Sequence, residues 1–478
     1  MKTFQEYERA KEQNEELDFI KQAINEYRSS EEYHTALDAD EYEAERNITI
    51  TKYTRWLYNA NGQQVEDFTA ANNKIASNFF HRLTTQRASY SLGNGISFAS
   101  RRKEQVDGGW VTVDETKDAL GKDFDTAIYT AGHYALIHGC CFLFWNLDHA
   151  DIFKMTEFCP LYDEYDGSLK AGFRFWSLDW EKRPVTVVVY EQDGYTKWRT
   201  RDGSNGLDLA IYEPKRAYKQ QIAHNDIDPD EIIGESNYTY LPIVPLWGSK
   251  HHQSDLVGMR SKIDALDLVV SGFADDLQDC AEIFWIVGNA LGMTEADLSH
   301  FRDRMKLQHI AVMDTDNTNI TPYKQEIPTA ARQTLIDSLR AQIYDDYGAL
   351  DVSHIGAGAN ITATEIKAAY QTMDEEADDF EYQVIKAIRG ILSILGIDDV
   401  PVFYRNRVSN EYEYTQMILM AANYLDDETV ISKLPFVTPD EVESILARRA
   451  LQAMFATNGQ EQPEEEGEET DEEAEEEV

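Results

Sequence analysis

An apolar seam of period 3.5 between residues 256 and 277 constrains the fold more than any other feature of the sequence. Its members follow one another at spacings of 3, 4, 3, 4, 3 and 4, which keeps them on one side of an α-helix for about six turns. Ser254 suits the N-cap and Asp255 the first turn, and such a helix is roughly 35–40 Å long. The seam must pack on another helix, from the same chain or from a second copy. Its residues are Leu256, Met259, Ile263, Leu266, Val270, Phe273 and Leu277.

A short mixed segment and a second long helix follow the seam. Residues 284–287 and 309–313 predict strands, and residues 294–305 between them predict a helix. Pro328 favours the start of the next helix. The apolar stripe of this second helix consists of Leu335, Leu339, Ile343, Tyr347 and Leu350.

A loop and a third long helix come next. Gly356 and Gly358 predict a flexible loop over residues 351–360. Thr362 and Glu365 form a capping box that begins a helix of more than thirty residues, which stops at Gly396. Beyond it the chain predicts short helices over residues 411–455 and a disordered acidic stretch over residues 461–478.

The first half of the chain mixes helices with strands, so the predicted fold class is α+β. Residues 1–45 predict acidic, exposed helix, and residues 72–83 predict a helix that leads into a turn at 91–96. Turn residues separate several alternating runs that are typical of strands. These runs cover residues 171–177, 185–190 and 195–199.

Residues 126–147 contain no Asp, Glu, Lys or Arg. A membrane span needs about 20 mostly apolar residues, and the polar residues His133, His138 and Asn146 argue against one here. We expect instead a buried helix over residues 124–138, a turn at Gly139 and a buried strand over residues 140–147, and no membrane contact.

The charge and cysteine content exclude several classes of protein. The chain has 44 basic and 87 acidic residues, a formal charge of −43, whereas tight nucleic-acid binding needs clustered Lys and Arg. The chain therefore avoids DNA, or handles it without holding it. Its four cysteines form no CxxC pair, which argues against a disulfide framework or a zinc ribbon and favours a reducing compartment.

No motif in the sequence predicts catalysis. Residues 314–319 resemble the start of a calcium loop, but Asn319 and Gln325 stand where Gly and Glu are needed. The Gly-rich residues 356–358 lack the following Gly-Lys-Ser/Thr of a phosphate loop, and neither G-x-S-x-G nor H-E-x-x-H occurs. We therefore expect no catalytic residue, no metal site and no cofactor.

Several short motifs, which occur in the order given below, resemble those of the bacteriophage portal family, in the branch found in long-tailed phages. Residues 90–96 are similar to its "Y-x-x-G-x-x-I" turn, and residues 161–164 followed by 171–175 are similar to one of its hairpins. Residues 242–255 resemble the entry into its first stem helix, with Lys250-His251-His252 in place of the usual Asn-Asn. Residues 431–440 resemble its C-terminal Pro-containing motif.

The resemblance implies a portal fold assembled as a ring, typically of twelve subunits, at one vertex of the virion after assembly in the host cytoplasm. It implies double-stranded DNA as cargo, bound without sequence specificity. Its further partners would be the terminase large subunit, head–tail adaptors, and the major capsid and scaffolding proteins. The implied parts are a mixed α/β wing (1–253), a two-helix stem (254–281 and 328–350), a small α/β clip (282–327), a tunnel loop (351–361), a long wing helix and strand (362–408), a helical crown (409–457) and an acidic tail (458–478).

The implied tunnel loop faces DNA. It carries His354 and Asn360 but no Lys or Arg, and Gly356 and Gly358 let it change shape as DNA passes. The alternative is an inert surface loop.

The implied clip contains a local basic cluster, Arg302, Arg304 and Lys306. Docking on an acidic motor surface is one interpretation of this cluster, and a solvated helix face is the other.

Two other classes of protein stay open at this point. An acidic scaffold or adaptor of phage assembly would share the helices and the charge but would not close into a ring. An enzyme with an unrecognised site would show a pocket of convergent titratable groups.

Overall fold

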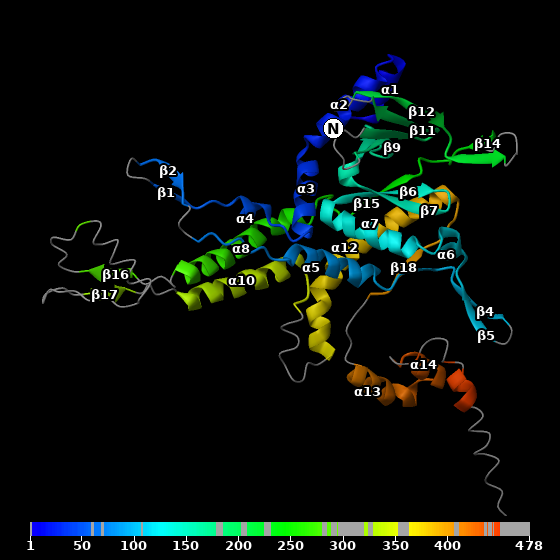
Figure 1. Cartoon of the computed structure of the whole chain (residues 1–478). Coiled ribbons are helices and arrows are strands. Elements are labelled where there is room, and N and C mark those ends of the chain that lie inside the picture. Colours follow the sequence, from blue (N-terminus) through cyan, green and yellow to red (C-terminus); the bar gives the residue numbers. More distant parts are fainter. Residues whose placement is uncertain are drawn as a thin grey trace, which may run out of the picture. The chain divides into compact units, whose positions relative to one another are not determined.

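The structure is a computed structural model of the chain, and it divides into two compact units, each described by itself (Figure 1). The first comprises residues 1–101, 114–352 and 371–406, and the second residues 102–113, 353–370 and 407–478. The described residues are 2–58, 62–67, 71–106, 109–177, 185–201, 208–223, 231–279, 284–287, 294, 320–323, 328–351, 363–405, 411–434, 437, 442 and 444–449.

A five-stranded antiparallel sheet, ordered β12-β11-β10-β9-β8, forms one layer of the first unit. The three strands predicted from alternation are confirmed as β9, β10 and β11, because their inward-facing side chains, among them Phe173 and Val187, are buried. The strands are β8 (Phe158–Tyr162), β9 (Leu169–Ser177), β10 (Val185–Glu191), β11 (Gly194–Thr200) and β12 (Leu209–Arg216).

The first two N-terminal helices cover this sheet and the third packs on a helix that follows it in the sequence, so the prediction that residues 1–45 are exposed helix is wrong. The helices are present as α1 (Phe4–Glu12), α2 (Glu16–Arg28) and α3 (Glu31–Glu43). The rings of Tyr7 and Phe173 lie 5.5 Å apart, edge to face. The acidic residues occupy only the outer side of these helices, and an apolar inner side that includes Ile20 and Ile24 is fully buried.

The uncharged stretch forms the buried helix and strand that the sequence predicts. Helix α7 (Phe124–His138) ends at Gly139 in a left-handed conformation, and β6 (Cys140–Asn146) follows at once. A Cβ at Gly139 would lie 2.6 Å from the carbonyl carbon of Gln253, so only glycine fits there. In the described part of the chain, no helix is both long and apolar enough to span a bilayer. Strand β6 is central in a second sheet with β7 (His149–Lys154) and β15 (Ile243–Trp247).

Helix α5 (Phe79–Leu92) corrects the prediction for residues 72–83. It begins at Phe79 and continues to Leu92, through part of the predicted turn, whereas residues 71–78 form no helix. The backbone N–H groups of Asn73 and Ile75 donate instead to Asp275 (2.6 Å) and Ser271 (3.0 Å) of a distant helix. Tertiary hydrogen bonds therefore override the apolar spacing of this segment.

Two long helices form an antiparallel pair, so the apolar seam packs on a helix of the same chain, one of the two alternatives that the sequence leaves open (Figure 1). They are α8 (Leu256–Asp279) and α10 (Thr329–Tyr347). Lys262 near the start of α8 pairs with Asp346 near the end of α10 at 2.6 Å, and Arg332 pairs with Asp276 at the opposite ends.

In the sequence between α8 and α10, β16 (Phe284–Val287) pairs with β17 (Ile320–Tyr323). The strand predicted at residues 309–313 and the helix predicted at 294–305 lie outside the described residues, apart from Thr294.

The third long helix, α12 (Ala363–Leu395), ends before Gly396 as predicted, with Gly396 at φ +73°. In the first unit it buries Phe380, Val384 and Ile388 against the main core. Strand β18 (Pro401–Phe403) then pairs with β3 (Ile96–Phe98). The predicted capping residue Thr362 lies outside the described residues.

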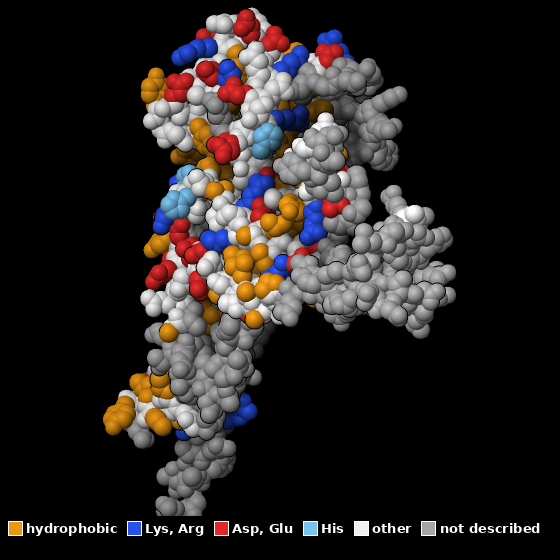
Figure 2. Space-filling view, turned by 90° about the vertical axis from the view of Figure 1, so that its left-hand side faces the viewer, with side chains coloured by type: hydrophobic (Ala, Val, Ile, Leu, Met, Phe, Trp, Pro, Cys, Tyr) orange, Lys and Arg blue, Asp and Glu red, His pale blue; other side chains and the backbone are white. Residues whose placement is uncertain are grey.

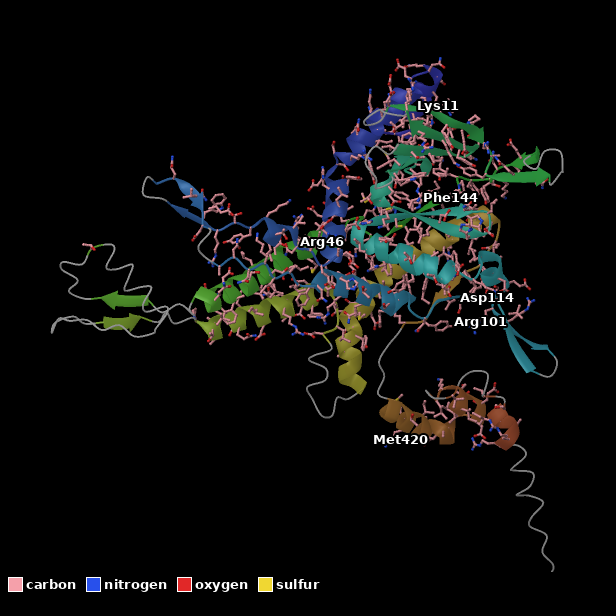
Figure 3. The ribbon with its side chains drawn as sticks, in the orientation of Figure 1. Lys11, Arg46, Arg101, Asp114, Phe144 and Met420 are labelled. Atoms are coloured by element: carbon pink, nitrogen blue, oxygen red, sulfur yellow. The ribbon has the colours of Figure 1, made fainter. Side chains whose placement is uncertain are left out.

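The second unit contains the hairpin β4 (Arg102–Val106) with β5 (Gly109–Val113), and the helices α13 (Glu411–Ala421) and α14 (Asp427–Ser432). Helix α13 exposes Met417 and Met420 (Figure 3). The remaining α-helices and strands belong to the first unit. They are α4 (Ile48–Lys52), α6 (Glu115–Leu120), β1 (Trp56–Tyr58), β2 (Gln64–Glu66), β13 (Lys219–Ala223) and β14 (Glu231–Ser236).

Replacing Ile24 by Ala should destabilise the first unit, because it leaves a cavity between α2 and the sheet. We expect a loss of about 2–5 kcal/mol in the free energy of unfolding, measured by urea denaturation. The control is Ile211→Ala, which shortens the same side chain at a site that is 59% exposed on β12 and should change stability by less than about 0.5 kcal/mol. Equal effects of the two substitutions would contradict the packing of α2 on the sheet.

Candidate functional site

The residues predicted to contact DNA or to dock a motor lie outside the described part of the chain. The described residues that come just before the predicted tunnel loop lie at the foot of the helix pair, which is where α8 begins, α10 ends and α12 passes. We take this foot as the candidate functional site. The residues outside the described part are His354, Gly356, Gly358, Asn360, Arg302, Arg304 and Lys306.

The seven seam residues of α8 fall into two groups. The first four, Leu256, Met259, Ile263 and Leu266, are buried in a cluster with Ile343, Tyr344 and Tyr347 of α10. Val270 packs against the edge of that cluster, and the Arg332 guanidinium lies 5.8 Å from the centre of the Phe273 ring. Leu277 is 53% exposed. The seam is therefore packed against residues of the same chain at the foot of the pair, and it is exposed to solvent toward the far end.

A second face of α8 carries a polar ladder that sequence reasoning missed. Asp264, Asp267, Ser271 and Asp275 recur at helical spacing, and each of them accepts a hydrogen bond from the N-terminal part of the chain, within residues 42–47 or 73–75. The Tyr42 hydroxyl donates to Asp264 at 2.5 Å, and the Asn47 amide donates to Asp267 at 2.9 Å.

Burial raises the pKa of Asp267, and the hydrogen bonds from Ser77 and from the Asn47 amide only partly offset this effect. Arg260, one turn before the ladder begins, extends the contact by pairing with Asp38 at 2.7 Å. The ladder therefore fastens the N-terminal segment along the length of α8.

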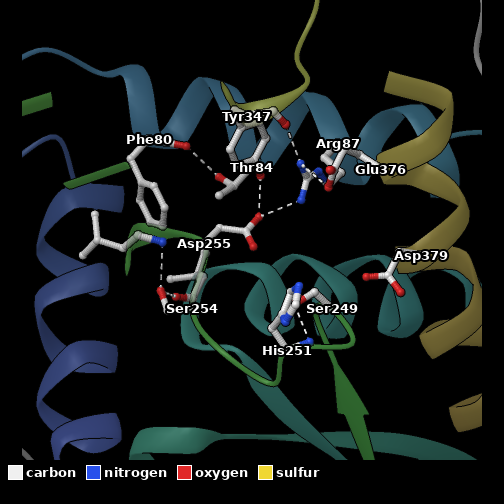
Figure 4. A network of polar contacts seen from close by, with 12 residues as sticks. Phe80, Thr84, Arg87, Ser249, His251, Ser254, Asp255, Tyr347, Glu376 and Asp379 are labelled. Atoms are coloured by element: carbon white, nitrogen blue, oxygen red, sulfur yellow. Dashed lines mark hydrogen bonds and ion pairs between the residues drawn. The ribbon is translucent and has the colours of Figure 1, made fainter. Parts of the chain in front are cut away.

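Arg87 of α5 joins the three helices at the foot (Figure 4). Its side chain is almost fully buried, and its guanidinium donates to Asp255 (3.2 Å) at the start of α8 and to the Tyr347 carbonyl (2.6 Å) at the end of α10. It also pairs with Glu376 of α12 at 3.2 Å and lies 4.0 Å from the centre of the Tyr347 ring. One cation thus holds one end of each of two helices and the side of a third.

Asp255 receives a second hydrogen bond, from the Tyr347 hydroxyl at 2.6 Å. Burial raises the pKa of Asp255, and the positive charge of Arg87 counteracts that rise. Burial also raises the pKa of the Tyr347 hydroxyl, which keeps it protonated as the donor. The contact therefore depends on an ionised Asp255, a neutral Tyr347 and a charged Arg87 together.

The loop before α8 borders a cavity of about 450 Å³ at this foot. Lys250 and His251 of this loop line the cavity together with Glu375, Glu376 and Asp379 of α12. The backbone N–H of Lys250 donates to Asp379 at 3.1 Å. The first two residues of the Lys-His-His sequence therefore lie beside an acidic side of α12, whereas His252 stacks on the ring of Trp247.

Residues 348–351, which follow α10, are held in place by contacts with α5, α10 and α12. Gly348 has φ +68°, and a Cβ there would lie 2.8 Å from Cγ of Glu376. The Gln86 side chain binds both the N–H and the carbonyl of Leu350, at 3.3 and 3.0 Å. Arg340 pairs with Asp351 at 3.2 Å. The start of the predicted tunnel loop is therefore held by α5 and α10.

Arg405, which follows β18 in the sequence, binds the acidic side of α12 much as Arg87 binds the ends of α8 and α10. Its guanidinium pairs with Asp374 (3.1 Å), Asp378 and Glu381 (2.9 Å), which lie on one side of α12. The hydrogen bond to Glu381 is the main cause that raises the pKa of Arg405 above its ordinary value. The Tyr90 hydroxyl donates to Asp374 at 2.5 Å and ties α5 to the same place.

The foot has the chemistry of a structural joint. In the described ranges, no group of three or more His, Cys, Asp or Glu side chains is placed to hold a metal ion. Acidic and basic side chains lie interspersed over the described part of the face in Figure 2. The arrangement fixes helix ends and the start of the following segment.

Comparison with known protein families identifies the family of this chain. Residues 26–477 match the family described as "Phage portal protein, SPP1 Gp6-like". The chain belongs to this portal family. The portal resemblance found in the short motifs is thereby confirmed, and so is the portal fold, in which helices and strands are mixed. Portal proteins are structural head–tail connectors rather than enzymes, so the portal chain is assigned no catalytic activity.

Two curated proteins are similar to this portal chain over most of their length. The portal protein of Clostridium phage phiCD119 is 24% identical over 402 residues, which are 78% of this chain and 83% of the relative. The portal protein of Bacillus phage SPP1 is 21% identical over 421 residues, 82% of this chain and 79% of the relative.

Solved structures with some likeness include two from gene transfer agent (GTA) particles. A chain from the neck of a native GTA particle, computed with C12 symmetry, has a TM-score of 0.41 and 12% identity, and the match covers 82% of this chain and 99% of that chain. A chain from the neck of an empty GTA particle has a TM-score of 0.42 and 9% identity over 75% of this chain and 90% of that chain.

Replacing Arg87 by Met should strongly destabilise the foot of the portal chain. Asp255 and Glu376 would lose their cation, and Asp255 would remain as a buried carboxylate without its charge partner. We expect a loss of about 3–5 kcal/mol in the free energy of unfolding, measured by denaturant titration.

Arg82→Met is the matched control, because Arg82 lies on the same helix with its side chain exposed, and it should change stability by less than about 0.5 kcal/mol. Adding Asp255→Asn to Arg87→Met removes the stranded charge and should recover part of the loss. If Arg87→Met is as mild as the control, Arg87 does not join the helices.

Proposed function

We propose that this portal chain forms a ring, dodecameric by expectation, at one vertex of the virion. The ring is the conduit for double-stranded DNA during packaging and ejection, and it docks the terminase large subunit and head–tail adaptors. It assembles in the host cytoplasm with the major capsid and scaffolding proteins. The observation that carries the proposal is the family match over residues 26–477.

The proposal gives each part of the chain a place in the ring. Helices α8 and α10 belong to the stem (254–281 and 328–350), and residues 282–327 form the clip. Residues 351–361 form the tunnel loop that faces DNA. The wing comprises residues 1–253 and 362–408, the crown residues 409–457, and residues 458–478 are an acidic tail.

Exposed apolar side chains on the helix pair support packing between neighbouring stems. Leu268 and Leu277 of α8 are 42% and 53% exposed, and Leu335 of α10 is 47% exposed. The apolar cluster at the foot does not reach Leu268, Leu277 or Leu335. A closed ring of identical subunits would cover such side chains on every copy without leaving free ends.

The charge of the chain supports a passive conduit. A formal charge of −43 gives few counterion-releasing contacts with phosphate, so a duplex would pass without being trapped. The predicted contacts through His354 and Asn360, and the docking role of Arg302, Arg304 and Lys306, complete the proposal.

Electron microscopy of the purified chain tests the proposed ring. Rings with a central hole somewhat wider than a DNA duplex are the expected result. Compact closed dimers without a channel would overturn the proposal.

Charging the exposed end of the helix pair should prevent ring formation while the subunit stays folded. In Leu268→Asp/Leu277→Asp, each interface would bury unpaired charges at a cost of several kcal/mol, repeated around the ring. We expect the fraction of chains in rings, measured by light scattering after gel filtration, to fall by roughly tenfold or more.

The control for this prediction is Tyr165→Asp, which adds a charge at an exposed turn between β8 and β9 and should leave assembly unchanged. Rings of normal abundance in the double variant would contradict packing between stems. Leu266 is unsuitable for this test, because it is buried in the subunit's own core.

A further inference from the structure

Three imidazoles and two carboxylates come together where α3 contacts α5 and α7. The carboxylates, Asp40 and Glu43, stand about one turn apart on α3. His81 belongs to α5, and His133 and His138 belong to α7. These groups lie within hydrogen-bonding or ion-pairing distance of one another and are not placed to hold a metal ion. The cluster is therefore the polar part of the contact between α3 and the two other helices.

Glu43 serves two imidazoles at once. Its Oε1 atom lies 2.7 Å from Nδ1 of His81 and 3.4 Å from Nε2 of His133. Its Oε2 atom accepts a hydrogen bond from the Thr84 hydroxyl at 3.2 Å. The side chains of Glu43 and His133 are only 18% and 20% exposed. Two imidazoles from different helices thus share one largely buried carboxylate oxygen.

His138 binds the second carboxylate. Its Nε2 atom lies 2.8 Å from Oδ1 of Asp40, and its side chain is fully buried. Its ring stacks on that of Tyr134, with the two centroids 5.6 Å apart. Lys154 of β7 lies 4.3 Å from the centre of the Tyr134 ring, and its charge acts on Asp40. The cluster therefore contains one cation besides its imidazoles.

The charged groups on the other sides of α3 are carboxylates and guanidinium groups. On the α8 side, Arg260 pairs with Asp38 at 2.7 Å, and Asp264 belongs to the polar ladder. On the short 3-10 helix η1 (Met155–Glu157), Glu157 pairs with Arg174 at 3.7 Å. The ordinary pKa values of carboxyl and guanidinium groups lie well outside the range from about pH 5 to pH 7. In that range the imidazoles of the cluster are the groups that titrate.

Charge balance limits the number of protons that the cluster accepts. With Asp40, Glu43 and Lys154 ionised, one charged imidazole balances the cluster, and each further one adds excess positive charge to a largely buried site. Burial lowers the pKa of His133, and the charges of His81 and His138 lower it further, whereas Glu43 counteracts this effect. His133 therefore stays neutral at pH values at which an exposed imidazole is protonated.

We propose that this cluster makes the attachment of α3 to α5 and α7 sensitive to acid. At neutral pH the cluster holds α3 in place. Below about pH 6.5, separation of α3 brings His133 into water, where the imidazole takes up a proton that the closed arrangement resists. The proposal goes beyond the portal role, concerns the single subunit and does not depend on ring formation.

Proton uptake fixes the direction of the effect. Between the ordinary pKa and the lowered pKa of His133, the opened state binds one more proton than the closed state. The equilibrium constant for opening therefore rises by up to about tenfold for each unit by which the pH falls. Burial raises the pKa of Asp40, but its hydrogen bond with His138 and the charges of His138 and Lys154 lower it below its ordinary value of 3.8. Asp40 thus adds to the loss only at still lower pH.

The test follows hydrogen–deuterium exchange of the α3 amides in the full-length chain by mass spectrometry, corrected for the intrinsic pH dependence of exchange. From about pH 7.5 to pH 5.5, the opening constant of α3 should rise by up to about tenfold. His133→Gln keeps a polar side chain but takes up no proton, so it should abolish most of this rise. His34→Gln is the matched control, because His34 is an exposed imidazole on α3 itself, and it should leave the rise unchanged.

A second measurement uses the wild-type chain and does not depend on the folding of a variant. Exchange of the imidazole C2 hydrogen, followed by mass spectrometry as a function of pH, gives the titration midpoint of His133. The expected midpoint lies below the ordinary value of about 6.5. A midpoint at or above that value, or an equal rise of the opening constant in wild type and His133→Gln, would overturn the proposal. Loss of the rise in His34→Gln would also contradict it.

Discussion

The buried guanidinium of Arg87 is the interaction on which the arrangement of the long helices depends. Helix ends carry unsatisfied backbone groups and partial charge, and a buried joint between several ends needs a partner for each of them. Arg87 supplies five fixed donors, a permanent charge and a flat face, and it uses all three on Asp255, Tyr347 and Glu376. A lysine could provide the charge but neither the forked geometry nor the stacking on Tyr347.

The helix pair is built as two halves with different requirements. Near the foot, apolar residues of α8 and α10 satisfy each other within one chain. Farther out, the polar ladder takes over one face of α8, while Leu268 and Leu277 remain open to solvent. A subunit of this kind is stable at its base before assembly, and only its outer half gains from a neighbour. One half of the helix pair therefore stabilises the fold of the single subunit, and the other half is available for contacts between subunits.

The sequence predicts the long helices and the buried stretch. A sustained period of 3.5 residues is compatible only with a helix, and a long run without charged residues is compatible only with a buried segment. It failed where partners are distant. The many acidic residues within 1–45 mask an apolar side that only the sheet reveals, and the helical spacing around Ile75 does not show the hydrogen bonds to Ser271 and Asp275 that replace a helix there. Arg87 gave no signal, since a single arginine in a helix is indistinguishable from a surface one until Asp255 and Glu376 are placed beside it. The ladder from Asp264 to Asp275 did have a period, and a search for polar stripes would have found it.

The same ladder has a mechanical consequence. Its contacts, from Arg260 to Asp275, are spread over roughly 22 Å of the axis of α8 at 1.5 Å per residue. A force directed along that axis loads these contacts side by side, in shear, and they must fail together. A force directed away from the axis at one end loads them singly, in a peeling mode. The segment that lies along α8 therefore stiffens the helix against longitudinal traction far more than against lateral lifting.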